Sequence, residues 1–379
     1  MGFRYSGYDV CLVQDCNLRC KYCSTGYGRW GNEPKIMSLE TIDRLVQFMI
    51  EHGDEKFRIS FSGGETLYAF DKLQYFIEKM MQAKKEAGKK VQIGTSTNGL
   101  NLTEEIADYL TFHKVNLTFS IDGDKVTNDR NRVMSTGRGV YDTIRTSLEI
   151  YRSSLERNGE GNARIKGECT VDEKADLFKS VLHLFDIGIH DVIARPADDS
   201  LLTGYKRGNS FEVFMVSFRR LVRFMLESLD VADIILDNQD RKFLNIQGIL
   251  PFIITGKWGV SPCEIITKNI CIMADGKITP CFLFNDIHDE MYEFGDIFNG
   301  VDWVKVNRLL ERLTPLTNDC MSCWCRSLCK VCYRALIDKK DTISKCKETQ
   351  FCWITKKSTA IVIEEVARRY GTQSQRMNK

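Results

Sequence analysis

Short apolar runs alternate with amphipathic patterns along residues 1–204 of the chain. The runs are rich in β-branched and aromatic residues and lead into polar or glycine-containing turns, as buried strands do. Between them, apolar residues recur at helical spacing; after Ser38, a suitable N-cap, Ile42, Leu45 and Met49 share one helix face. This alternation predicts an α/β fold with a parallel sheet, a barrel or part of one, whose site lies at the carboxyl ends of the strands. The six predicted strands are residues 8–14, 57–61, 91–95, 115–121, 163–171 and 191–195.

The pattern changes three times in the rest of the chain. Residues 205–257 are helix-like, and large apolar residues repeat on one face, which predicts a packing helix. A stretch rich in cysteine and loop-forming residues follows, and from Trp353 the pattern predicts a final helix with a polar tail from Gly371. The repeating apolar face consists of Phe211, Phe214, Phe218, Leu221, Phe224 and Met225. The expected segments are residues 1–204, 205–257, 258–352 and 353–379.

Composition indicates an ordinary globular chain of 379 residues, 43% hydrophobic and 27% charged. Because 53 basic side chains face 51 acidic ones, there is no electrostatic case for nucleic acid or an anionic membrane as the main partner. No apolar run is long enough to span a bilayer, and the N-terminus has no signal-peptide core. We therefore expect a cytoplasmic protein.

The cysteine content changes this picture. The chain has 15 cysteines, and ten of them lie from Cys263 to Cys352. Disulfides are rare in the cytoplasm, so this density predicts a separate domain with metal or redox chemistry. Cys11 and Cys169 fall within predicted strands and are expected to be buried core thiols.

A second group of cysteines follows the first predicted strand. Cys16, Cys20 and Cys23 have the spacing C-x₃-C-x₂-C, and no fourth cysteine lies near in sequence. Three such thiolates suit three corners of a cubane iron–sulfur cluster, which leaves one iron open to a small molecule. The alternatives are a zinc site with a distant histidine as fourth ligand, or a chance spacing.

The surrounding residues resemble the radical S-adenosylmethionine (SAM) superfamily, whose signature is C-x₃-C-x-aromatic-C, with Tyr22 in the aromatic place. Residues 62–65 (Ser-Gly-Gly-Glu) resemble the Gly-Gly-Glu motif of that family, in which backbone and carboxylate receive the amino group of SAM. Residues 95–99 and 120–123 resemble the corresponding loops of anaerobic sulfatase-maturating enzymes. The resemblance implies a [4Fe-4S] cluster on Cys16, Cys20 and Cys23, with SAM contacts from Tyr22, Gly63, Gly64, Glu65, Asn98, Ser120 and Arg132.

The later cysteines resemble a SPASM domain, an extension with two auxiliary clusters. The resemblance implies one [4Fe-4S] cluster on Cys263, Cys271, Cys281 and Cys332, and another on Cys320, Cys323, Cys329 and Cys352. Two departures from the pattern stand out: Cys329 and Cys332 are separated by two residues instead of three, and Cys346 competes with Cys352 as a ligand. Two zinc ribbons are the alternative. The implied architecture is a partial (β/α)6 TIM-like barrel, a cysteine-rich SPASM domain and a C-terminal helix, with three [4Fe-4S] clusters in total.

The family comparison also bears on the reaction. Sulfatase maturases carry an aspartate directly after the cysteine that matches Cys281, where this chain has Phe282. Formylglycine formation is therefore disfavoured, and the leading hypothesis is a radical SAM enzyme that modifies a ribosomally made precursor peptide, by thioether or carbon–carbon cross-linking or by backbone excision or rearrangement. The alternatives are an oxidising maturase of a protein side chain, a dehydrogenase of a small molecule, and a metal-binding module without catalysis.

Partners and further residues follow from the same hypothesis. Only 15 residues precede Cys16, so we expect a separate leader-recognition protein or direct docking of the peptide. An external donor of the flavodoxin or ferredoxin type would supply electrons. Arg195, at the end of the sixth strand, is expected to contact SAM or substrate, or to form a core salt bridge. No residue can be assigned as catalytic base.

Overall fold

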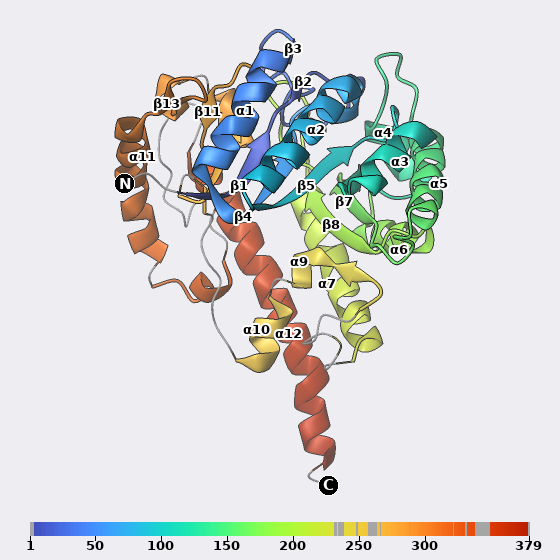
Figure 1. Ribbon diagram of the computed structural model, residues 1–379. Coiled ribbons are helices and arrows are strands. Elements are labelled where there is room, and N and C mark those ends of the chain that lie inside the picture. Colours follow the sequence, from blue (N-terminus) through green and yellow to red (C-terminus); the bar gives the residue numbers. More distant parts are fainter. Residues whose placement is uncertain are drawn as a thin grey trace.

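A single sheet of nine strands organises the molecule (Figure 1). In this computed structural model the described residues are 4–230, 233, 239–247, 249–256, 264–265, 267–287, 289–320, 322–329, 332–337 and 349–377. The strand order is β11-β10-β1-β4-β5-β6-β7-β8-β9, and every neighbouring pair is parallel except β10 and β11. The strands are β1 (Tyr5–Val10), β4 (Gly53–Phe61), β5 (Lys90–Thr97), β6 (Asn116–Ser120), β7 (Lys166–Val171), β8 (Asp191–Pro196), β9 (Lys242–Phe243), β10 (Asn269–Ile272) and β11 (Ile278–Thr279).

The helices connect and cover these strands. They are α1 (Leu39–His52), α2 (Phe70–Glu86), α3 (Glu104–Phe112), α4 (Lys125–Asn131), α5 (Tyr141–Arg157), α6 (Leu177–Asp186), α7 (Ser210–Ser228), α9 (Leu244–Gln247), α10 (Leu250–Thr255), α11 (Trp303–Cys320) and α12 (Gln350–Met377). None of the described helices is both long and apolar enough to cross a bilayer. Two small ribbons, β2 (Val13–Gln14) with β3 (Lys35–Ile36) and β12 (Gly295–Asp296) with β13 (Gly300–Val301), complete the fold.

The six predicted strands are present in the predicted order as β1, β4, β5, β6, β7 and β8, which confirms the parallel α/β fold. The first helix begins as expected, because the side chain of Ser38 accepts a hydrogen bond from the backbone N–H of Thr41. The first strand begins and ends earlier than predicted, at Tyr5 and Val10, and the end of the predicted stretch forms the separate strand β2. Helix α4 was not predicted; it is seven residues long and has no apolar stripe.

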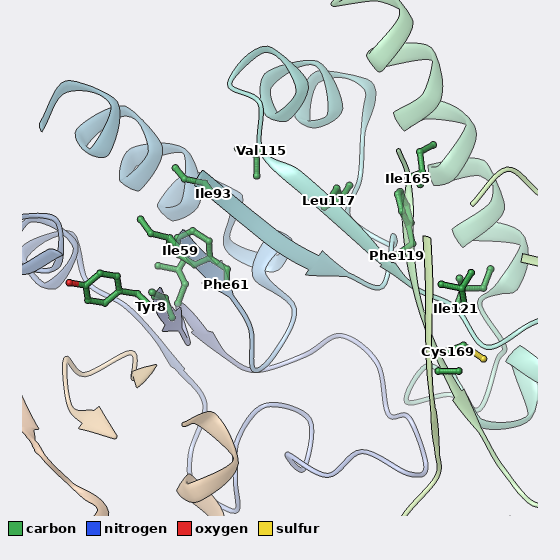
Figure 2. Packing of buried hydrophobic residues seen from close by; sticks show 14 of the residues in the cluster. Tyr8, Ile59, Phe61, Ile93, Val115, Leu117, Phe119, Ile121, Ile165 and Cys169 are labelled. Atoms are coloured by element: carbon green, nitrogen blue, oxygen red, sulfur yellow. The ribbon is translucent and has the colours of Figure 1, made fainter. Parts of the chain in front are cut away.

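The core lies between the sheet and its helices and holds the strand ends in place. Figure 2 shows buried side chains spread along this core, one from each of five successive strands: Tyr8, Ile59, Ile93, Phe119 and Cys169. All five are buried, with at most 3% of their surface exposed. Close-packed interiors have low compressibility, so this core gives the loops at the carboxyl ends a firm base.

Both edges of the sheet are completed by later parts of the chain. Beside β8 lies β9, a two-residue strand inside the segment expected to be helical throughout. At the opposite edge, β10 and β11 come from the cysteine-rich region and extend the sheet beyond β1. Helix α12 packs along α7 and continues to Met377, through the stretch expected to be a tail, and its C-terminal end projects away from the sheet (Figure 1).

Candidate active site

A cavity of about 360 Å³ opens at the carboxyl ends of the parallel strands. Loops after β2, β4 and β5 and residues at the ends of β6, β7 and β8 form its wall. All ten residues expected to hold the first cluster or SAM line it: Cys16, Cys20, Tyr22, Cys23, Gly63, Gly64, Glu65, Asn98, Ser120 and Arg132. Residues up to 116 positions apart in sequence thus meet in one place, as expected for loops that follow neighbouring strands of a parallel sheet.

The cysteine loop directs hydrogen-bond donors at its own sulfur atoms. The backbone N–H of Leu18 lies 3.4 Å from Cys16 Sγ, and that of Tyr27 lies 3.2 Å from Cys23 Sγ. The side-chain amide of Asn98 approaches Cys16 Sγ to 3.7 Å. Donors of this kind stabilise a thiolate more than a thiol, so the loop suits sulfur atoms that are bound to a metal centre.

The chemistry of these thiols also fits a cluster. Burial raises the pKa of Cys16 and of Cys20 to about 12, so the positive charge of a metal centre is needed to deprotonate them. Among the described residues, no three His, Cys, Asp or Glu side chains converge closely enough for a single metal ion. Three thiols that surround a cavity, each able to bind a different iron, suit a cubane better than a mononuclear zinc site.

Two glycines allow the cysteine loop and the Gly-Gly-Glu loop to touch. A Cβ atom on Gly64 would lie 1.9 Å from the carbonyl oxygen of Asp15, and one on Gly28 would lie 2.4 Å from the Cα of Gly64. The backbone N–H groups of Gly64 and Glu65 donate to the carbonyls of Val13 and Asp15, at 3.2 and 2.8 Å. Gly28 also has φ = +80°, which favours glycine. The two loops are therefore in direct backbone contact beside the cavity.

Glu65, which follows Gly64 in this contact between the two loops, is buried, with 2% of its surface exposed. Its carboxylate accepts hydrogen bonds from the Thr97 hydroxyl at 2.8 Å, the Asn98 backbone N–H at 2.7 Å and the Leu67 backbone N–H at 3.2 Å. These bonds join the loop after β4 to the end of β5. Burial raises the pKa of Glu65 to about 7 in spite of these donors.

A buried charged network stands on the other side of the cavity. The Asp122 carboxylate accepts hydrogen bonds from the Tyr22 hydroxyl and from the Thr170 backbone N–H, and pairs with the Arg132 guanidinium at 3.0 Å. Arg132 also lies over the ring of Tyr22, with 5.7 Å between its Cζ and the ring centroid. Among the described residues, the buried Nε of Arg132 has no hydrogen-bond partner. The network fixes the aromatic residue between Cys20 and Cys23.

Comparison with known proteins identifies this part of the chain. Residues 10–162 match the Radical SAM superfamily. The chain carries a radical SAM domain. It is 28% identical over 142 residues to the cysteine-type anaerobic sulfatase-maturating enzyme of Clostridium perfringens (strain 13), covering 36% of this chain and 38% of that protein. It is 30% identical over 112 residues to a GTP 3′,8-cyclase of Haemophilus influenzae (strain PittEE), covering 29% and 31%. The aligned parts thus span well under half of these relatives.

Solved structures resemble the whole chain in fold. Native anSMEcpe, an anaerobic sulfatase-maturating enzyme, with bound AdoMet has a TM-score of 0.75 at 18% identity and covers 97% of this chain and 99% of its own. Streptococcus suis SuiB bound to the precursor peptide SuiA has a TM-score of 0.61 at 16% identity, covering 92% and 76%. These likenesses show that the chain shares its overall fold with both proteins, the cysteine-rich C-terminal region included.

Beside the radical SAM domain, three of the four cysteines expected for the first auxiliary cluster are described. Cys271 lies on β10, and Cys281 and Cys332 lie near each other in loops; Cys263 is outside the described residues. Burial raises the pKa of Cys281, and the neighbouring Cys271 and Cys332 thiols raise it further. Cys11 is buried, as expected for a core thiol, but sequence reasoning did not predict its contact with Cys271, whose Sγ lies 3.8 Å from Cys11 Sγ. No local spacing signals this contact, because β1 and β10 meet only in the sheet.

The four cysteines expected for the second auxiliary cluster surround a small cavity of about 40 Å³. They are Cys320, Cys323, Cys329 and Cys352. Cys325, which the spacing left unassigned, is buried and lines the same cavity. Cys346, the rival to Cys352, is outside the described residues. The C-x-C spacing of Cys323 and Cys325 is the signal in the sequence that could have placed Cys325 here.

The positions relevant to an oxidising maturase contain no free carboxylate among the described residues. Phe282, directly after Cys281, begins a short 3₁₀ helix and packs against buried Cys11, Trp30 and Cys271. Asp286 is paired with Arg334 at 2.8 Å. Arg195 lines the cavity at the strand ends and is 62% exposed. Its guanidinium lies 3.8 Å from the Glu168 carboxylate, so it does not form the core salt bridge that was one of the two expectations from sequence.

Proposed function

We propose that this protein is a radical SAM peptide maturase that acts on a ribosomally made precursor peptide. The observation that carries the proposal is the single cavity lined by the three cluster cysteines and all seven expected SAM contacts. A [4Fe-4S] cluster held by Cys16, Cys20 and Cys23, together with SAM, would supply the radical chemistry that removes a hydrogen atom from the substrate.

Different residues of the cavity would bind the cluster and different parts of SAM. Cys16, Cys20 and Cys23 would hold three irons of the cluster and leave the fourth open to SAM. Gly63 and Gly64 line the part of the cavity proposed for the amino group of SAM, and Glu65 would place a carboxylate next to it. Arg132 fits the SAM carboxylate or ribose, because its buried Nε is without a partner in the described structure, and Ser120 lines the same wall. Asn98 and Tyr22 complete the proposed contacts.

We also propose that the cysteine-rich region binds two auxiliary [4Fe-4S] clusters, each through one of the two groups of four cysteines given above. A peptide as substrate is supported by the fold neighbours, since anSMEcpe is solved with a bound Cp18Cys peptide and SuiB with its precursor SuiA. The product would carry a cross-link or an excised or rearranged backbone. A separate leader-recognition protein and a flavodoxin or ferredoxin in the cytoplasm remain the proposed partners.

The alternative is an oxidising maturase of a protein side chain, or a dehydrogenase of a small molecule. It is favoured by the sequence match to the cysteine-type sulfatase maturase. Against it stands Phe282, which occupies the place of the aspartate expected in that group. The peptide maturase therefore remains the first proposal.

Anaerobic reconstitution tests the proposal. Loaded protein should contain about 12 irons per chain and release 5′-deoxyadenosine from SAM with dithionite, since each of three clusters holds four irons. Cys16→Ala should lose about four irons and all SAM cleavage, whereas Cys169→Ala, which removes a buried thiol of the core, should lose neither. Absence of SAM cleavage by the fully loaded protein would refute the proposal.

Co-expression with a short peptide encoded beside the gene distinguishes the reactions. A mass loss of about two units indicates cross-linking or oxidation, and a larger loss indicates excision. Modification of a sulfatase-type serine or cysteine to formylglycine would instead support the alternative.

A further inference from the structure

A second and larger cavity adjoins the cavity that the proposed cluster and SAM would occupy, which we call the SAM cavity. Its volume is about 590 Å³, and it lies between the end of β8, helix α7 and the first turns of α12. Arg195, Pro196 and Asp198 line both cavities. The two cavities are therefore neighbours, and these three residues form their common boundary.

Aromatic side chains form the wall of this second cavity on the side of α7. Phe211, Phe214 and Phe218 lie three or four residues apart on one helix face and are at most 4% exposed. The rings of Phe214 and Phe218 are stacked, with 5.9 Å between their centroids and 18° between their planes. Facing them are Phe351 and Ile354 of α12, both half-buried. The face that the sequence assigned to packing thus also bounds an open space.

The polar groups deeper in this wall already have protein partners. The Asn245 side chain donates to the Ala194 carbonyl at 2.7 Å and accepts from the Ala194 N–H at 2.8 Å. Arg334 pairs with Asp286 and donates to the Ile337 carbonyl at 2.7 Å. The interior consequently favours an apolar group over a charged one, because a buried charge without a partner is costly.

Exposed charged side chains lie at the boundary between the two cavities. Arg195 and Asp198 are 62% and 66% exposed, and their nearest ion-pair partners are 3.8 Å away. Such loosely held groups can contact the backbone or end of a peptide without disturbing the fold. Apolar walls with a charged mouth are typical of sites that hold one large side chain of a longer ligand.

We propose that this second cavity receives a large apolar side chain, preferably aromatic, from the substrate peptide, beside the residue that loses its hydrogen atom. This inference rests on the proposed function and names its substrate class: a peptide with an aromatic or large aliphatic residue next to the reacting position. Burial of such a side chain strengthens binding roughly tenfold or more relative to glycine.

A defined peptide pool tests this inference. The probe is an equimolar set of acetylated, amidated hexapeptides Gly-Gly-Ser-Xaa-Gly-Gly, incubated anaerobically with the cluster-loaded protein and SAM but no reductant. Peptides retained on a size filter are measured by mass spectrometry. Those with Phe, Tyr, Trp, Leu or Met at Xaa should be retained about tenfold more than those with Gly, Asp or Lys. Equal retention of all peptides, or preference for charged ones, overturns the proposal.

Two variants locate the binding. Ser358→Phe adds bulk to the cavity from α12 and should abolish the apolar preference. Val216→Phe adds the same side chain to α7 where the surface is 68% exposed, so it should keep the preference. Iron content and thermal unfolding verify that both variants are folded and loaded. A folded Ser358→Phe protein that keeps the full apolar preference contradicts the assignment. As a second check, Ile354→Ala, which enlarges the cavity, should weaken the preference severalfold.

A separate readout distinguishes this inference from the proposed function. Release of 5′-deoxyadenosine with dithionite, in the absence of peptide, should be the same in wild type, Ser358→Phe and Val216→Phe. If wild type fails to cleave SAM but selects apolar peptides, the proposed function is wrong and the cavity assignment stands. If SAM is cleaved normally but the peptides are not discriminated, only the cavity assignment is wrong.

Discussion

Gly64 has no side chain, and this allows two loops beside the cavity to contact each other. It was expected to let a ligand approach the backbone, and in the structure it lets the chain itself approach, because the Asp15 carbonyl occupies the space of its Cβ. Gly64→Ala must displace the loop that carries Cys16. We expect the reconstituted variant to lose about four irons per chain and to unfold at a lower temperature than wild type.

A control at another glycine isolates this effect. A Cβ on Gly161 would meet Glu156 at 3.7 Å, an ordinary contact, and its φ is not in the left-handed region. Gly161→Ala should therefore keep the iron content and stability of wild type. If Gly64→Ala also keeps all of its iron, the backbone contact does not position the first cluster.

Glu65 gives a prediction for pH. Its pKa in the folded protein is about 7, raised by burial from the ordinary glutamate value of 4.5. Between these values the folded state binds more protons than the unfolded state, so the contribution of Glu65 to stability is full below pH 4.5 and is lost as pH rises through 7. The loss amounts to roughly 3 kcal/mol at most. Glu65→Gln does not titrate in this range.

Thermal unfolding of the metal-free protein measures this effect. The Tm of wild type minus that of Glu65→Gln should fall as pH rises from 5 to 7 and stay constant from 7.5 to 8.5. A difference that is flat across the whole range, or that grows with pH, contradicts the raised pKa.

At the scale of elements, an ion-pair cluster fastens α12 to α7. Glu365 of α12 is 2% exposed and accepts hydrogen bonds from Arg223 at 3.0 Å, from Arg219 at 3.2 Å and from Arg368 of its own helix at 2.8 Å. Hydrogen bonds from Arg223 and the other two guanidinium groups lower the pKa of Glu365 to about 2. Its stabilisation is therefore present above about pH 4.5 and is lost as pH falls toward 2.

Glu365→Gln should reduce the free energy of unfolding by about 1–2 kcal/mol at pH 7, because the arginines are partly exposed and solvent weakens the pairs. Urea titration of the metal-free protein gives this value. Glu364→Gln, which removes an exposed partner of Arg219 alone, should change stability by less than about 0.5 kcal/mol. Equal effects of the two substitutions would show that burial of Glu365 adds nothing.

The elements also show which parts of the fold are readable from sequence. Long amphipathic helices with a capping residue, such as α1 after Ser38, are encoded locally and were predicted within a residue or two. Strand β9 has only two residues, too few to show a period, and α4 lacks an apolar stripe. The ten cavity residues expected to hold the cluster or SAM were predicted from motifs at strand ends, since parallel strands bring those ends together. Contacts across the sheet, such as Cys11 with Cys271, have no local signal.

For the molecule as a whole, the cysteine-rich region and the barrel share one sheet. Strand β10 pairs with β1, and α12 covers the apolar face of α7. A chain that ends at residue 257 loses both partners and exposes the edge of β1 together with that apolar face. We expect this truncated protein to be insoluble or aggregated, as measured by size-exclusion chromatography after expression at low temperature.

A chain that lacks only residues 374–379 serves as control and should elute like the full-length protein. A soluble, monomeric 1–257 fragment with a cooperative unfolding transition would show that the barrel is stable without its C-terminal strands.

The pairing of β1 with β10 can form only late in synthesis, because β10 is translated long after β1. Cys11 and Cys271, which touch across this pair, are 260 positions apart. At 5–20 residues per second, a ribosome needs about 13–52 s to add the residues between them. During that interval the nascent barrel has one strand without its neighbour, while the cysteine loop and the Gly-Gly-Glu loop are already outside or near the exit of the ribosome. An unpaired strand edge is prone to aggregate, so we expect slow translation of the C-terminal region to lower the yield of folded protein.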